Sequence, residues 1–165
     1  DNSDLTPLAS ATQQQQVLQH CNRAVAQGAQ LITGGKIPTS MPGYFFEPTI
    51  FCGVSAEMDL FQQEVFGPVI AITPFDTEQQ AWELANGTEY GLVAGIFSQN
   101  LNCCLRGTRA LKAGQVFVNE WYAGGVETPF GGTGLSGFGR EKGQEALYSY
   151  VRSKNIAMRI AAGSA

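Results

Sequence analysis

Segments with the period of a helix and segments typical of strands alternate along this chain of 165 residues. A chain that alternates in this way packs its helices onto the faces of a sheet whose strands run mostly in one direction. We therefore predict an α/β fold with a largely parallel sheet and flanking helices. The chain is long enough for one domain with a real hydrophobic core.

The first helix should begin after Ser10, because Ser10 and Gln13 have the spacing of a capping box. Apolar residues then recur at the helical period, at Val17, Cys21, Ala24 and Val25. Gly28 follows the last of them and should end the helix.

The later elements are predicted from the same patterns. Strands are expected at 44–51 and 69–75, and two buried strands at 92–98 and 115–119. A second helix from Asp76 to Asn86 should bury Ala81, Trp82 and Ala85. A third helix at 100–113 should turn five side chains inward, those of Leu101, Cys104, Leu105, Thr108 and Leu111. A last helix is expected at 141–148 and a terminal strand at 155–160.

The composition excludes several classes of protein. Hydrophobic residues make up 44% of the chain and charged residues 15%, which is typical of a packed globular domain. The net charge is −4 and no basic patch occurs, so we expect no nucleic-acid partner. No apolar run approaches the roughly 20 residues that span a bilayer, so we expect no membrane partner either.

A glycine-rich stretch, "PFGGTGLSGFGREKG" at 129–143, contains the spacing G-x-G-x-x-G at Gly132, Gly134 and Gly137. A dinucleotide-binding turn also needs a strand directly before it, a helix directly after it and an acidic residue about 20 residues on. The nearest predicted strand ends at Asn119, and no Asp or Glu follows Glu145. We therefore do not interpret the stretch as a pyrophosphate loop.

Nucleophiles and metal ligands are poorly supported. The single histidine, His20, adjoins Cys21, but adjacent side chains on a helix point about 100° apart. The four cysteines, at 21, 52, 103 and 104, contain no C-x-x-C spacing, and no tetrahedral metal set is apparent. We expect no metal site, and we expect a reduced, cytoplasmic protein.

The stretch "EVFGPVIAI" at 64–72 has a clearer position. Gly67 and Pro68 interrupt the chain immediately before an apolar strand, which holds Glu64 and Phe66 at the mouth of the sheet. Open α/β sheets bind ligands at such edges. A plain turn with a solvated Glu64 and a core Phe66 is the alternative.

Five stretches taken together resemble the C-terminal third of the aldehyde dehydrogenase superfamily. They are "GYFFEPTIF" (43–51), "QQEVFGPV" (62–69), "ANGTEYGLVAGIFS" (85–98), "GQVFVN" (114–119) and "PFGGTGLSGFGREKG" (129–143). Order and spacing match from about Thr6 to Ile160. The resemblance implies that the nucleotide lies on a separate Rossmann-like domain and that the glycine-rich stretch belongs to the substrate side.

In that family a cysteine thiolate attacks the aldehyde, hydride passes to NAD(P)+, and a glutamate-activated water releases the acid. The resemblance places that nucleophile, that base and the cofactor domain upstream of Asp1. Residues 1–150 are then the C-terminal portion of the catalytic domain, and 151–165 an oligomerisation strand and tail. The expected cofactor of the complete enzyme is NAD or NADP, and its substrate a small-molecule aldehyde. The chain alone should be inactive.

The resemblance carries over to individual residues. Glu64 matches a glutamate that binds the hydroxyls of the nicotinamide ribose, and Phe66 matches the aromatic residue beside the nicotinamide. Phe130 matches the aromatic residue that packs on the aldehyde. Glu141 matches an acid with a possible proton-path role, a structural role being the alternative.

Trp121 and Tyr122 fall where substrate-pocket residues cluster in the family. Their aromatic walls would suit an aryl aldehyde, or a cationic one through cation–π contact. For Asn119, which ends the strand before them, we expect a structural role.

The terminal stretch alternates between two faces, with Ile156, Met158 and Ile160 on the apolar one. The resemblance implies that this strand crosses to a neighbouring subunit and gives a homodimer or homotetramer. Pairing within its own chain is the alternative. For the whole protein, the alternative interpretation is a naturally truncated, non-enzymatic paralogue that acts as an assembly or interaction module.

Overall fold

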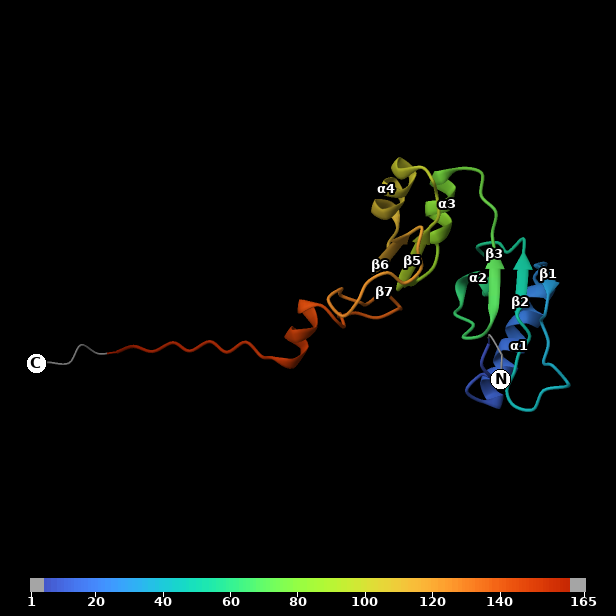
Figure 1. Cartoon of the computed structure of the whole chain (residues 1–165), viewed down its shortest axis with the longest axis horizontal. Coiled ribbons are helices and arrows are strands. Elements are labelled where there is room, and N and C mark those ends of the chain that lie inside the picture. Colours follow the sequence, from blue (N-terminus) through green and yellow to red (C-terminus); the bar gives the residue numbers. More distant parts are fainter. Residues whose placement is uncertain (1–4, 161–165) are drawn as a thin grey trace, which may run out of the picture. The chain divides into compact units, whose positions relative to one another are not determined.

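The structure is a computed structural model that describes residues 5–160, and the chain divides into two compact units. The first unit comprises the chain up to Glu89 together with Arg109–Leu111. The second comprises Tyr90–Thr108 and the chain from Lys112 onward. Each unit combines helices with strands, which confirms the α/β fold (Figure 1).

Helix α1 spans Ala11–Ala26 and begins as predicted. The Ser10 hydroxyl accepts a hydrogen bond from the Gln13 backbone N–H at 3.2 Å, and the Gln13 side chain accepts one from Ala9 N–H at 3.2 Å. The cap therefore satisfies backbone donors that a helix leaves unpaired at its N-terminus. Val25 does not face inward as predicted, since it lies beside the buried stripe and is 52% exposed.

The first unit contains a three-stranded sheet in the order β1-β2-β3 (Figure 1). Its strands are β1 (Gln30–Thr33), β2 (Thr49–Cys52) and β3 (Val69–Ile72). β2 pairs antiparallel with β1 and parallel with β3, so that Thr49 lies opposite Val69. β2 and β3 are shorter than the predicted strands, and β1 was not predicted.

The core of the first unit lies between α1, this sheet and a short helix, α2 (Asp59–Gln62). Its buried hydrophobic residues are Val17, Cys21, Ala24, Ala29, Phe46, Phe51, Val54 and Leu60. Asp59 joins α2 to α1, because its carboxylate lies 3.3 Å from the Arg23 guanidinium and accepts a hydrogen bond from Gln27 at 3.2 Å. These contacts tie α2 to α1 at the edge of the core.

Helix α3 spans Glu78–Ala85 and begins two residues after the predicted start at Asp76. The Thr77 hydroxyl, and not Asp76, accepts the capping hydrogen bond from Gln80 N–H at 3.2 Å. Ala81 and Trp82 are half-buried, while Ala85 is exposed. The predicted end at Asn86 is confirmed.

The second unit contains two small sheets. β5 (Val93–Ile96) and β6 (Gln115–Val118) pair in parallel, and β4 (Tyr90–Gly91) pairs antiparallel with β7 (Thr133–Gly134). Within residues 5–160 the strands therefore form three sheets instead of one, and two of the four strand pairs are parallel.

Burial in the second unit is lower than predicted, because a two-stranded sheet covers only a narrow face. Ile96 and Phe117 are buried, but Leu92 and Phe97 are exposed. Helix α4 (Leu101–Ala110) buries Cys104, whose thiol lies 3.6 Å from the Ser98 carbonyl, and leaves Leu101 and Leu105 exposed, contrary to the prediction. Thr108 and Leu111 are half-buried.

The C-terminal elements differ from the prediction in kind. Gln144–Tyr150 forms a 3-10 helix, η1, in place of the expected helix at 141–148. Glu141 is used in a backbone bridge, and Lys142 and Gly143 have positive φ, which an α-helix cannot accommodate.

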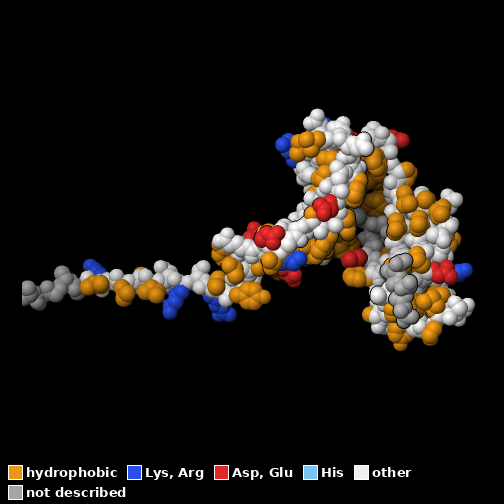
Figure 2. Space-filling view, viewed as in Figure 1, with side chains coloured by type: hydrophobic (Ala, Val, Ile, Leu, Met, Phe, Trp, Pro, Cys, Tyr) orange, Lys and Arg blue, Asp and Glu red, His pale blue; other side chains and the backbone are white. Residues whose placement is uncertain are grey.

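Residues 151–160 form neither helix nor strand, and all of them are exposed (Figures 1 and 2). The predicted strand at 155–160 is thus not paired with any strand of the described chain. No helix among residues 5–160 has the length and apolar character needed to cross a membrane.

Candidate functional site

The glycine-rich stretch serves close backbone packing. β7 lies in this stretch and pairs with β4. A Cβ added to Gly114 would collide with the Gly131 carbonyl oxygen, and one added to Gly132 would lie 2.6 Å from Ser136 Cβ. These glycines bring backbone segments together where a side chain would not fit.

The same stretch folds back on the segment that precedes it. Phe130 and Glu141 exchange two backbone hydrogen bonds of 2.7 Å, and Gly143 N–H donates to the Val126 carbonyl at 2.7 Å. The Gln115 side chain donates to the Pro129 carbonyl at 3.0 Å, which ties the segment to β6. Glu141 is brought next to Phe130 by its backbone, and its side chain is exposed.

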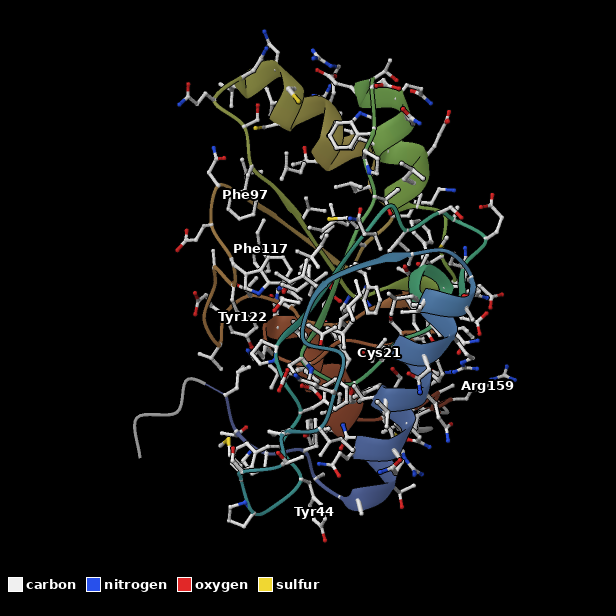
Figure 3. All side chains as sticks on the ribbon, turned by 90° about the vertical axis from the view of Figure 1, so that its right-hand side faces the viewer. Cys21, Tyr44, Phe97, Phe117, Tyr122 and Arg159 are labelled. Carbon is white, nitrogen blue, oxygen red and sulfur yellow. The ribbon has the colours of Figure 1, made fainter. Side chains whose placement is uncertain are left out.

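The two segments joined by the Phe130–Glu141 bridge form a hairpin. A small cavity lies between this hairpin and β6. Its volume is about 10 Å³, and its lining includes Phe117, Tyr122, Phe130 and Lys142. Figure 3 shows Phe117 and Tyr122 close together, and their ring centroids are 6.3 Å apart. Two predicted pocket residues, Tyr122 and Phe130, thus meet around one cavity.

The third predicted pocket residue, Trp121, lies elsewhere. Its ring meets Phe117 edge-on at a centroid distance of 6.1 Å. It also covers β5, since a Cβ on Gly95 would lie 2.9 Å from Trp121 Cζ3. Trp121 is not among the residues that line the cavity.

Lys142 was not singled out in the sequence. Its ammonium nitrogen lies 5.6 Å from the ring centroid of Tyr122 and 5.6 Å from that of Phe130. Only the hairpin brings Lys142 to the aromatic pair, and the sequence carries no signal for that backbone bridge.

The Glu64–Phe66 loop belongs to the first unit and is held by α1. The Gln13 side-chain amide donates to the Phe66 carbonyl at 2.5 Å. A Cβ on Gly67 would lie 2.6 Å from Val17 Cγ2, so the loop approaches the helix closely. Glu64 is exposed and Phe66 is 67% exposed, which excludes a core role for this phenylalanine within the described chain.

Asn119 has the structural role expected for it. Its side chain accepts a hydrogen bond from Ser98 N–H at 2.8 Å and donates one to the Ser98 carbonyl at 2.9 Å. These bonds join the ends of β5 and β6.

The four cysteines are all free thiols, and two of them, Cys21 and Cys104, are buried. None of the four forms a disulfide bond. Cys21 is in the core, and burial raises the pKa of its thiol to about 11. Burial, followed by the charge of Arg23, lowers the pKa of His20, whose Nδ1 lies 3.3 Å from the Arg23 guanidinium. Across residues 5–160 no cluster of three metal-ligating side chains occurs.

Comparison with known proteins gives a consistent result. The chain matches the aldehyde dehydrogenase family over residues 1–156. It is 41% identical over 150 residues to betaine aldehyde dehydrogenase from Cereibacter sphaeroides, covering 91% of this chain and 31% of that protein. It is also 41% identical over 153 residues to the peroxisomal aminoaldehyde dehydrogenase 1 of Pisum sativum, covering 92% and 30%. The chain thus spans about a third of the length of these curated relatives.

Solved structures agree with this. Betaine aldehyde dehydrogenase from Staphylococcus aureus in complex with NAD+ superposes with a TM-score of 0.90 at 36% identity, covering 93% of this chain and 31% of that one. Indole-3-acetaldehyde dehydrogenase from P. syringae, in complex with NAD+ and IAA, gives 0.86 at 40% identity, covering 90% and 30%.

Proposed function

Since the chain belongs to the aldehyde dehydrogenase family, we propose that it supplies part of the cofactor and substrate contacts of an NAD(P)-dependent enzyme. That enzyme oxidises an aldehyde to a carboxylic acid. The observation that carries this proposal is that Tyr122 and Phe130 line one cavity, in a chain that also presents an exposed Glu64 and Phe66.

The Glu64–Phe66 loop is proposed to contact the nicotinamide end of NAD(P). A carboxylate accepts two hydrogen bonds, which suits the two hydroxyls of a ribose. The exposed ring of Phe66 is available to pack against the nicotinamide, and the bond from Gln13 fixes the loop that carries it. The chemistry that the cofactor supplies is the uptake of a hydride from the oxidised carbon.

Phe130 is proposed to pack on the aldehyde, with Tyr122 beside it. Trp121, which follows the end of β6, is proposed to belong to the same substrate pocket. Glu141 is proposed to serve a proton path or to be structural. Its backbone bridge to Phe130 supports the structural role, and the exposure of its side chain leaves the carboxylate accessible.

The nucleophile and the general base are proposed to come from sequence outside these 165 residues. Thiolate formation at Cys21 is disfavoured by burial, and Cys104 is buried as well. The curated relatives are about three times longer than the matched region, which leaves room for both groups. The named relatives are dehydrogenases, so the alternative of a non-enzymatic assembly module is not favoured.

The substrate does not follow from similarity. The names of the relatives give betaine aldehyde, aminoaldehydes and indole-3-acetaldehyde, which differ in charge and size. We therefore propose an aldehyde as the substrate class and do not propose a particular aldehyde.

The exposed terminal segment is proposed to pair with a second copy and so to give a homodimer or homotetramer. Its apolar residues Ile156, Met158 and Ile160 are exposed in the single chain (Figure 2). A cytoplasmic location is proposed from the absence of disulfide bonds among the four cysteines.

The test is an assay of aldehyde-dependent reduction of NAD+ and NADP+. A longer protein that contains this chain together with its upstream sequence should form NAD(P)H with at least one of a panel of aldehydes. The 165-residue chain should form none at enzymatic rates. Turnover by the short chain, or no turnover by the longer protein with any aldehyde, would contradict the proposal.

A further inference from the structure

The aromatic pair of the cavity already holds a cation. The Lys142 ammonium lies 5.6 Å from both ring centroids, Tyr122 and Phe130, which is within the range of about 6 Å for a cation–π interaction. Lys142 takes no part in the ion pairs Arg23–Asp59 and Lys36–Glu47. Aromatic faces, and not a carboxylate, hold this ammonium group.

The backbone places Lys142 next to the two rings. Lys142 has φ 58° and Tyr122 has φ 68°, a left-handed conformation that is unfavourable for residues with a side chain. The Phe130–Glu141 bridge and the bond from Gly143 N–H to the Val126 carbonyl hold the two sides of the hairpin together. Such strain persists only where the surrounding structure imposes it, and it concentrates at functional positions.

The space left beside Lys142 is small. A cavity of about 10 Å³ has room for about one water molecule. A quaternary ammonium group is several times larger, and it would need the same ring faces that Lys142 covers.

We propose that Lys142 determines specificity at this site by occupying, from within the chain, the aromatic surface that a cationic ligand would use. The pocket then excludes cationic aldehydes and favours uncharged ones, including aryl aldehydes. This statement about substrates rests on the proposed function. The occupied aromatic pair itself is a property of the chain alone.

The experiment measures binding of tetramethylammonium chloride to the 165-residue chain by NMR titration of the aromatic resonances. The Lys142→Ala variant should bind the cation about 10-fold more tightly than the unaltered chain, because both ring faces become available. Lys142→Arg keeps a cation in place and should show no gain. Adding Phe130→Leu to Lys142→Ala should remove the gain.

Equal affinity of the unaltered chain and Lys142→Ala, whether measurable or absent, overturns the proposal. So does a gain that survives Phe130→Leu. If a variant does not fold, an NMR measurement on the unaltered chain tests whether the rings hold Lys142. Ring currents should shift the Lys142 Hε resonances upfield. Unshifted resonances overturn the proposal. None of these readouts uses turnover, so failure of the proposed function would leave the result unchanged.

Discussion

Four residues other than glycine have positive φ within residues 5–160: Phe66, Asn119, Tyr122 and Lys142. Phe66, Tyr122 and Lys142 belong to the proposed cofactor and substrate contacts, and Asn119 lies three residues before Tyr122. Left-handed backbone costs a side-chain-bearing residue about 1–2 kcal/mol. Two of these four positions, Phe66 and Tyr122, are therefore strained residues for which the sequence already predicted a role in the site.

Glu64 gives a prediction at the level of one side chain. In the complete enzyme, Glu64→Gln should lower kcat by about 10- to 100-fold, because a nicotinamide that is less well positioned transfers hydride poorly. The kinetic isotope effect with a deuterated aldehyde should rise, and cofactor affinity should change less than kcat. The neighbouring exposed Gln63→Ala is the matched control and should behave like the parent. An unchanged kcat and an unchanged isotope effect would mean that Glu64 is only a turn residue.

Cys21 gives a prediction about pH. Burial raises the pKa of its thiol from 9.0 to about 11, so the folded state disfavours the thiolate. The resulting stabilisation is complete below pH 9 and is lost as the pH rises to about 11. The change in the free energy of unfolding is about 2 kcal/mol.

The measurement compares urea unfolding of the parent and Cys21→Ala across this range. Other alkaline titrations are common to both proteins and cancel in the difference. The free-energy advantage of the parent should shrink by about 2 kcal/mol between pH 9 and pH 11. A constant difference would mean that Cys21 does not titrate with unfolding.

Among the elements, those with local signals were predictable. α1 follows from a capping box and an apolar stripe, and both its cap and its buried stripe are confirmed apart from Val25. β1 was missed because its four residues are all exposed and show no alternation. α2 is a single turn, too short to have a period.

Elements and contacts that depend on distant partners were not predictable. The helix expected at 141–148 loses its first turn to the Phe130–Glu141 bridge. The same bridge creates the contact of Lys142 with the aromatic pair. Tyr122 and Phe130 could be assigned to one pocket from their family resemblance. The position of the Lys142 ammonium near both rings could be found only from the three-dimensional structure.

The sheets differ in a way that hydrogen exchange can detect. β2 is paired on both sides, by β1 and β3, and its Phe51 is fully buried. β5 and β6 pair only with each other among the described residues. Isolated two-stranded sheets are marginally stable in water, and local opening is easiest where few apolar contacts oppose it.

In the 165-residue chain, amides of Val93–Ile96 should therefore exchange at least about 10-fold faster than the amide of Phe51. Exchange followed by mass spectrometry or NMR measures both segments in one sample. The central amides of α1 serve as a slow reference. Equal protection of the two sheets would show that β5 and β6 are stabilised by contacts beyond their pairing.

At the scale of the whole molecule, the proposed contacts are divided between the two units. Glu64 and Phe66 belong to the first unit, and Tyr122, Phe130 and Glu141 to the second. Neither unit alone carries both the cofactor and the aldehyde residues. The proposed function would therefore need both units, together with the sequence proposed to supply the nucleophile and the base.

The terminal segment gives the last prediction. Its residues Ile156, Met158 and Ile160 expose apolar side chains, and its alternating pattern suits a strand that the described chain does not pair. An unpaired strand needs a sheet edge for its backbone groups, and a second copy can offer one. Deleting everything after Ser153 from the complete enzyme should convert oligomers into monomers or aggregates, measured by light scattering. Deleting only the residues after Ile160 is the matched control and should keep the parent's mass. If the longer deletion also keeps the parent's mass and activity, the segment does not hold the assembly together.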